Sequence, residues 1–143
     1  MSVAFVFPGQ GSQQPGMLHH LLNHPAIGRT LDEISEELHS DVRNLDTEHC
    51  LQSDVSVQLA LFASGVATAR ALMEQDLRPT ATAGLSVGAF AAAVTAGVLL
   101  YPILGLAAAP DAAIAVPKFG PCLLLKPRKS QMFCPSTLTR VGR

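Results

Sequence analysis

The chain has 143 residues, which allows one modest domain, and apolar residues make up 48% of it. That share can supply a core and excludes a disordered polypeptide, while the formal net charge of -1 argues against a nucleic-acid-binding protein. The three cysteines form no C-x-x-C pair, so neither a disulfide framework nor a metal site is indicated. A reducing, cytoplasmic compartment fits this cysteine usage.

A continuous run of apolar, β-prone residues at positions 3–7 opens the chain. Such runs are typical of a strand buried on both faces in a parallel sheet. The following loop, residues 8–17, is rich in glycines and side-chain amides, and we interpret it as one wall of a ligand site. Its G-x-G pattern is a weak dinucleotide fingerprint, because Gln14 stands where close helix packing needs a small residue.

Two helices are predicted next. Residues 25–39 place apolar side chains at helical spacing, with acidic residues on the other face. Residues 41–50 are polar and predict a connecting loop. Ser53 or Asp54 can then cap a long helix that runs to about Met73. One apolar face is predicted for this helix, marked by Val55, Leu59, Phe62, Val66, Ala69 and Met73. The five histidines show no metal-binding spacing and are interpreted as surface or packing residues.

The pentapeptide Gly84-Leu85-Ser86-Val87-Gly88 lies between a short β-prone run and an alanine-rich segment. This order predicts a strand, a sharp turn and a helix, the context of a nucleophile elbow. Glycines on both sides let the helix pack close to the strand, and N–H groups at the helix start suit a developing oxyanion. By itself the motif fits equally well a tight turn that carries a surface serine.

Residues after 99 have no clean period, and prolines and glycine interrupt every possible element. We therefore predict a division at this point, with an irregular, poorly ordered tail over residues 100–143.

No charged residue occurs between Arg78 and Asp111, a span long enough to cross a bilayer. Prolines and glycines break this span, so we expect no membrane association; a membrane protein is the minority alternative.

Three stretches together resemble the malonyl-CoA:acyl-carrier-protein transacylase family. They are the string FVFPGQGSQ at residues 5–13, Gln58 within an Ala/Leu-rich helix, and GLSVGAF at residues 84–90. The resemblance covers about residues 1–99 and implies an α/β fold, part of a hydrolase-like acyltransferase domain with a parallel sheet. Leu85 stands where the family usually has histidine, and this version resembles the epsilon subunit of malonate decarboxylase, a malonyltransferase.

The resemblance implies a role for four residues. Ser86 matches the nucleophile, Gln10 and Val87 match the oxyanion-hole positions, and Gln58 matches an amide that lines the acyl pocket. The implied partners are malonyl-CoA and either an acyl carrier protein or the malonate decarboxylase carrier subunit, in fatty acid synthesis or malonate decarboxylation. No cofactor is implied, because the acyl group passes through an acyl-serine.

Two parts of the family pattern are missing. No histidine follows His49, and no arginine occurs between Arg78 and Arg128, so neither the general base nor the carboxylate-binding arginine is recognised. We therefore expect this chain to be inactive or nearly so, and its tail to be a frameshifted or mis-joined reading frame. A non-catalytic module that binds an acyl group or CoA is the alternative. We also expect poor solubility, because an incomplete sheet exposes an edge strand.

Overall fold

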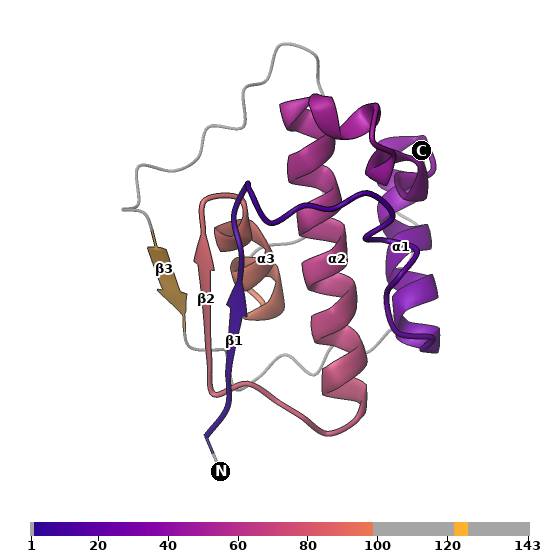
Figure 1. Ribbon diagram of the computed structural model, residues 1–143. Coiled ribbons are helices and arrows are strands. Elements are labelled where there is room, and N and C mark those ends of the chain that lie inside the picture. The colour runs from indigo at the N-terminus through magenta and orange to yellow at the C-terminus, as the bar shows by residue number, and fades with distance from the viewer. Residues whose placement is uncertain (1, 99–121, 126–143) are drawn as a thin grey trace, which may run out of the picture.

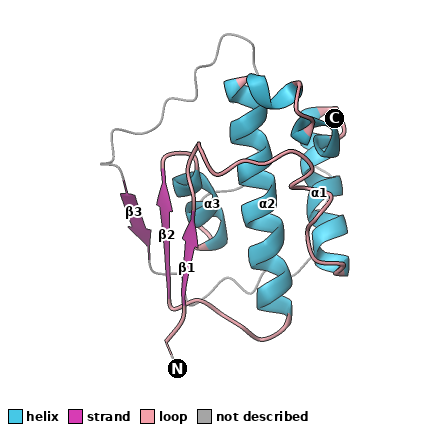
Figure 2. Cartoon of the chain, in the orientation of Figure 1, coloured by secondary structure: helices cyan, strands magenta, loops and turns pink. Residues whose placement is uncertain are grey.

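The computed structural model describes residues 2–98 and 122–125 and confirms the predicted α/β fold class (Figures 1 and 2). Its elements follow in chain order: strand β1 (Ala4–Phe7), helix α1 (Pro25–Leu38), 3₁₀ helices η1 (Val42–Asp46) and η2 (Cys50–Gln52), helix α2 (Asp54–Glu74), strand β2 (Ala81–Leu85), helix α3 (Gly88–Thr95) and strand β3 (Cys122–Leu125).

The described strands form one sheet in the order β1-β2-β3. β1 and β2 are parallel, with Ala4 opposite Ala81 and Phe7 opposite Gly84, so the expected parallel pairing is confirmed. The helices that join them make the crossover that parallel strands require. Their carboxyl ends lie at the same edge of the sheet, at the top of Figure 1.

β3 pairs antiparallel to β2, with Leu85 opposite Cys122. The sequence predicted no regular element in the tail, and β3 departs from that prediction. The physical reason is that the second edge of β2 offers unpaired backbone groups, which a short run of consecutive leucines can satisfy as an added strand. The rest of the tail, and the predicted division at residue 99, lie outside the described residues.

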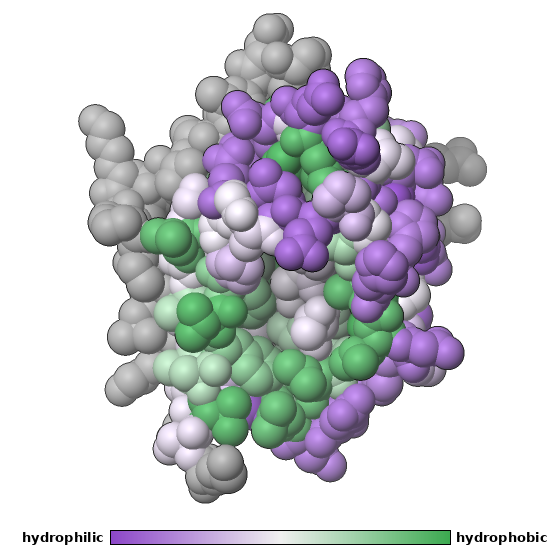
Figure 3. Space-filling view, viewed as in Figure 1, coloured by the Kyte–Doolittle hydropathy of each residue, from purple (hydrophilic) through white to green (hydrophobic). Residues whose placement is uncertain are grey.

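The sheet is covered on one face within the described part of the chain. Phe5 and Phe7 of β1 are buried, whereas Ala4 and Val6 are exposed, Val6 to 75%. The prediction of a strand buried on both faces was therefore wrong for β1, because the described helices pack against the side of the two phenylalanines. Figure 3 shows hydrophobic surface gathered over the lower half of this view.

The two long helices form most of the core. α1 begins at Pro25, its cap residue His24 accepts the Ala26 N–H, and its predicted apolar stripe packs into the core. α2 lies between α1 and α3 and has ten buried residues on all its sides rather than on the single predicted face. The outlying member of that face, Val55, is 48% exposed because it lies in the first turn, beyond the packed part.

α2 is also the one helix of the described residues that is long and apolar enough to cross a membrane. More than half of its most apolar window, 56%, is buried inside the protein, and core helices of soluble proteins pass the same test. The uncharged span noted in the sequence is different. Its described part contains β2, a turn and the eight-residue α3, so no continuous helix runs through that part.

Residues 41–50 were predicted to be a loop but contain η1 and the start of η2. Asp41 caps η1, because its carboxylate oxygen accepts the Arg43 N–H at 3.0 Å. η1 packs against both α1 and α2, and its Val42 is fully buried. An aspartate can start a short helix by accepting a backbone N–H of its first turn. The polar composition of residues 41–50 alone does not indicate this helix.

Candidate active site

Ser86 lies at the turn between β2 and α3 with a backbone φ of 53°. This left-handed conformation is uncommon for a residue with a Cβ atom. Among the described residues, two other non-glycine residues have a positive φ, His39 and Asp76, and both follow the ends of helices, where this conformation is ordinary. Ser86 instead precedes a helix, and its carbonyl oxygen accepts the Ala89 N–H at 2.9 Å. The strand, sharp turn and helix predicted for the pentapeptide are all present.

Both glycines of the pentapeptide are required by close backbone contacts. A Cβ atom on Gly84, in β2, would overlap the carbonyl group of Gly88, the first residue of α3. A Cβ atom on Gly88 would overlap the carbonyl oxygen of Phe7 and lie 2.5 Å from that of Pro8. The start of α3 therefore rests directly on the end of β1, which only glycine permits.

The loop after β1 passes beside the serine. A Cβ atom on Gly9 would lie 2.9 Å from the Leu85 carbonyl oxygen and 3.3 Å from Ser86 Cβ. Because Gln10 follows Gly9 directly, its backbone lies beside the elbow as well. The fold thus brings Gly9, the chain neighbour of the predicted site residue Gln10, against the predicted nucleophile Ser86 from a position far away in the sequence.

Val87 follows the serine and immediately precedes the first turn of α3. It is buried, with 4% of its surface exposed, whereas Ser86 is exposed. The first N–H groups of a helix have no partner within it and favour negative charge. Ser86 is therefore exposed to solvent beside the N-terminus of α3, whose unpaired N–H groups suit an oxyanion.

The other end of α3 is fixed by Gly97, at a φ of 71°. Its N–H donates to the Val94 carbonyl oxygen at 3.0 Å, and the Val98 N–H donates to that of Ala93 at 2.9 Å. These two bonds form a Schellman motif, so Gly97 caps the C-terminal end of α3. Along the helix, the buried Thr82 hydroxyl donates to the Ala92 carbonyl oxygen at 3.0 Å and ties α3 to β2.

Gln10 also contacts the start of α2. Its Nε2 donates to Asp54 Oδ1 at 3.3 Å. Gln58 lies four residues after Asp54 on the same helix, is half-buried, and belongs to the end of α2 at the same edge of the sheet as the elbow (Figure 1). The sequence does not mark Asp54 as a neighbour of Gln10, because a position at a helix start gives no sign of this contact.

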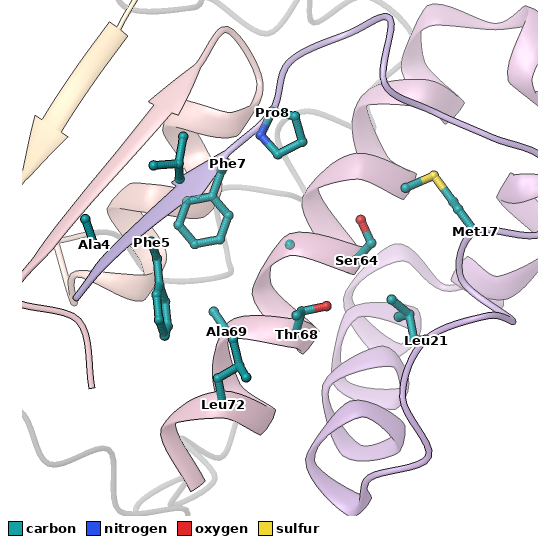
Figure 4. Close-up of a pocket in the computed structure, with 12 residues that line it drawn as sticks. Ala4, Phe5, Phe7, Pro8, Met17, Leu21, Ser64, Thr68, Ala69 and Leu72 are labelled. Carbon is teal, nitrogen blue, oxygen red and sulfur yellow. The ribbon is translucent and has the colours of Figure 1, made fainter. Parts of the chain in front are cut away.

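A separate cavity of about 420 Å³ runs along β1, between that strand and α2 (Figure 4). Its walls are mostly apolar, and the Ser64 hydroxyl in them donates to the Leu61 carbonyl oxygen. None of the four predicted site residues is among the described residues that line it. The cavity is therefore distinct from the elbow, although Pro8, at its upper end in the figure, immediately precedes Gly9.

The arginines of the helical layer are paired with carboxylates. Arg43 lies 2.8 Å from Asp32, and Arg70 lies 2.6 Å from Glu33. Within the described ranges, no group of three or more potential ligand side chains could hold a metal ion. The functional groups that the described elbow region offers are therefore the Ser86 hydroxyl, backbone N–H groups and glutamine side-chain amides.

The family model for the acyl transferase domain matches residues 4–102 of this chain. The chain belongs to this family. It is 38% identical over 104 residues to the malonyl CoA-acyl carrier protein transacylase of Bacillus subtilis (strain 168), an alignment that covers 69% of this chain and 32% of that protein. The resemblance predicted from the three sequence stretches is confirmed at the level of the family.

Solved structures give the same result. The malonyl CoA-acyl carrier protein transacylase from Coxiella burnetii superposes with a TM-score of 0.69 at 36% identity, over 76% of this chain and 36% of that one. A malonyl-transacylase solved in complex with its type II PKS acyl-carrier protein gives 0.67 at 35% identity, over 76% and 37%. The chain thus spans about a third of the length of these relatives. The likeness to the malonate decarboxylase epsilon subunit stays a prediction.

Proposed function

We propose that Ser86 is the acyl-accepting nucleophile of a malonyl-transfer site. The observation that supports this most directly is the exposed Ser86 at positive φ on a turn between a strand and a helix, with Gly9 packed against it. Strain of this kind persists at sites where the surrounding structure enforces it, as the contacts at Gly84 and Gly88 do here.

In this proposal the Ser86 hydroxyl attacks the thioester carbonyl of malonyl-CoA. The C–S bond breaks, CoA leaves as its thiol with the serine proton, and a malonyl ester remains on Ser86. A carrier thiol then attacks the ester, which regenerates the serine. The backbone N–H groups of Gln10 and Val87 hold the oxyanion in both steps, and Gln58 lines the acyl pocket. Loss of one such donor generally raises the barrier by about 3 kcal/mol.

The carrier is an acyl carrier protein or the malonate decarboxylase carrier subunit. Support for the first comes from relatives named as malonyl CoA-acyl carrier protein transacylases, one of them solved with its carrier. Support for the second is the Leu85 variant of the motif. Transfer from acylated protein to each purified carrier, followed by mass spectrometry of the carrier, distinguishes the two.

We expect acylation to be slow. A serine hydroxyl is a weak nucleophile at neutral pH without a base, and no histidine follows His49 in the sequence. Incubation with malonyl-CoA and intact-protein mass spectrometry should therefore show a single malonyl adduct that forms far more slowly than in full-length relatives. Ser86→Ala should abolish the adduct, whereas Ser40→Ala, at an exposed site near the end of α1, should leave it unchanged.

An adduct that persists in Ser86→Ala would refute the proposal, and acylation as fast as in the relatives would refute the expected slowness. The absence of a recognised base favours one competing function, a non-catalytic module that binds the acyl group or CoA. Calorimetric binding of malonyl-CoA without any adduct on Ser86 would establish that function instead.

A further inference from the structure

A buried carboxylate fixes the far end of the loop that joins β1 to α1. The Asp46 side chain, in η1, is 2% exposed. Its Oδ2 accepts the Leu18 N–H at 2.8 Å and the His19 Nδ1–H at 3.0 Å. The Asp46 carbonyl oxygen also accepts the Gly16 N–H at 2.9 Å. A buried carboxylate needs such partners to offset its lost hydration, and these all come from residues 16–19.

Hydrogen bonds continue from this anchor toward the elbow. The loop is therefore braced along its length rather than held only at its ends. Three bonds make up the series: Met17 N–H to the Gln14 carbonyl oxygen at 3.1 Å, Gly11 N–H to Gln13 Oε1 at 2.7 Å, and the Ser12 hydroxyl to the Gly9 carbonyl oxygen at 2.8 Å.

The element that carries Asp46 is itself firmly packed. η1 contacts both long helices, and Val42 within it is fully buried. At the near end of the loop, Gly9 lies against Ser86. The side-chain contact from this loop to α2, between Gln10 and Asp54, is exposed and long at 3.3 Å, so it is a weaker restraint than the bonds to Asp46. Asp46 accepts a buried hydrogen bond from the loop, at the Leu18 N–H, whereas the loop bonds of Gln10 and Gln13 are exposed.

We infer that Asp46 is a positioning residue for the elbow: it holds residues 8–19 so that the Gly9–Gln10 backbone stays against Ser86. The inference rests on the proposed function, in which the Gln10 N–H binds the oxyanion. Donors of this kind must stay within about 0.5 Å of the productive geometry, and a buried support is what achieves this. Asp46 touches no reacting atom and acts through the loop.

Hydrogen exchange and Ser86 acylation test the inference together on the full chain, with malonyl-CoA as the probe. Asp46→Ala removes the acceptor of both side-chain bonds. It should speed amide exchange across residues 9–19 by about tenfold or more. It should also slow acylation about tenfold to a hundredfold at saturating malonyl-CoA, with little change in the half-saturating concentration, because a misplaced donor affects the reaction more than binding.

Two variants make the comparison specific. Asp46→Asn keeps an acceptor oxygen in the same place, so it should restore most of the slow amide exchange and most of the acylation rate. Loss of packing alone would not predict this recovery. Glu48→Ala changes an exposed carboxylate two residues after Asp46 and should leave loop exchange and acylation as in the unmodified chain.

The inference is overturned if Asp46→Ala speeds exchange only at residues 16–19 and leaves residues 9–15 and acylation unchanged. If the unmodified chain is never acylated, the proposed function fails, and exchange at residues 9–15 still decides the inference. If Asp46→Ala does not fold, His19→Ala decides, because it removes one of the two bonds from a side chain that is 59% exposed. Unchanged exchange at residues 9–15 in that variant would overturn the inference.

Discussion

The elbow and the helical layer are held together by different kinds of contact. At the elbow, backbone meets backbone: Gly84, Gly88 and Gly9 lie where a single Cβ atom would overlap or crowd a neighbouring segment. In the layer formed by α1, η1 and α2, buried side chains pack against one another, and exposed ion pairs lie on the outside. Close backbone contacts therefore define the elbow, whereas packing of apolar side chains holds the helical layer together.

This difference determines what each region tolerates. A side-chain core can shift to accommodate small changes, whereas a carbonyl group in direct contact with a glycine has nowhere to move. The exposed serine depends on the less tolerant region. Reactivity of Ser86 should therefore be lost at substitutions that alter its glycines, while substitutions in the helical layer should mainly change the free energy of unfolding.

The largest effect is expected for Gly84→Ala, because the new Cβ atom would overlap the Gly88 carbonyl group. It should lower the free energy of unfolding by more than about 3 kcal/mol and abolish acylation of Ser86. Gly28→Ala is the matched control in the helical layer, since a Cβ atom there has open space within 4 Å and alanine favours helix. It should stabilise by up to about 1 kcal/mol. Urea denaturation of both variants checks this, and equal effects would refute the contrast.

Ile34→Ala should have the next largest effect on stability. Ile34 is fully buried in α1, so its truncation leaves a cavity and lowers the free energy of unfolding by about 3 kcal/mol. Under conditions where this variant remains folded, Ser86 should react at the unmodified rate. A loss of reactivity in the folded variant would show that the two regions are not separable.

Thr82→Val probes the side-chain tie between β2 and α3. It removes the hydroxyl that donates to the Ala92 carbonyl oxygen while keeping the side chain's shape. The free energy of unfolding should fall by about 1 kcal/mol, the usual net value of a buried hydrogen bond. Thermal melts measure it, and an effect as large as that of Gly84→Ala would mean that side chains, not backbone contacts, hold α3 in place.

The smallest effects are expected at the outer ion pairs. Asp32→Ala removes the exposed partner of Arg43 and should change stability by less than about 0.5 kcal/mol.

Asp41 adds a pH dependence, because the bond from the Arg43 N–H holds the pKa of its carboxyl below the ordinary value of 3.8. Its stabilisation is present above that value and is lost as the pH falls through the lowered pKa. The stability difference between the unmodified chain and Asp41→Asn, from urea midpoints, should therefore shrink in acid.

The sequence by itself determined the order of β1, the two long helices, β2 and α3, the elbow and the family. Apolar runs and helical periodicity located β1, both long helices and the strand before Ser86, since these patterns depend on neighbours along the chain. The pentapeptide predicted its own turn, because its glycines are needed wherever a strand and a helix meet that closely.

Only the tertiary structure decided which sites lie together and which surfaces stay open. It placed Gly9 against Ser86, connected Gln10 to Asp54 and buried Asp46 beneath residues 16–19. It also left one face of β1 exposed and added β3 to the sheet. Such contacts join residues tens of positions apart, and they follow from how the helices pack on the sheet rather than from any local pattern of residues.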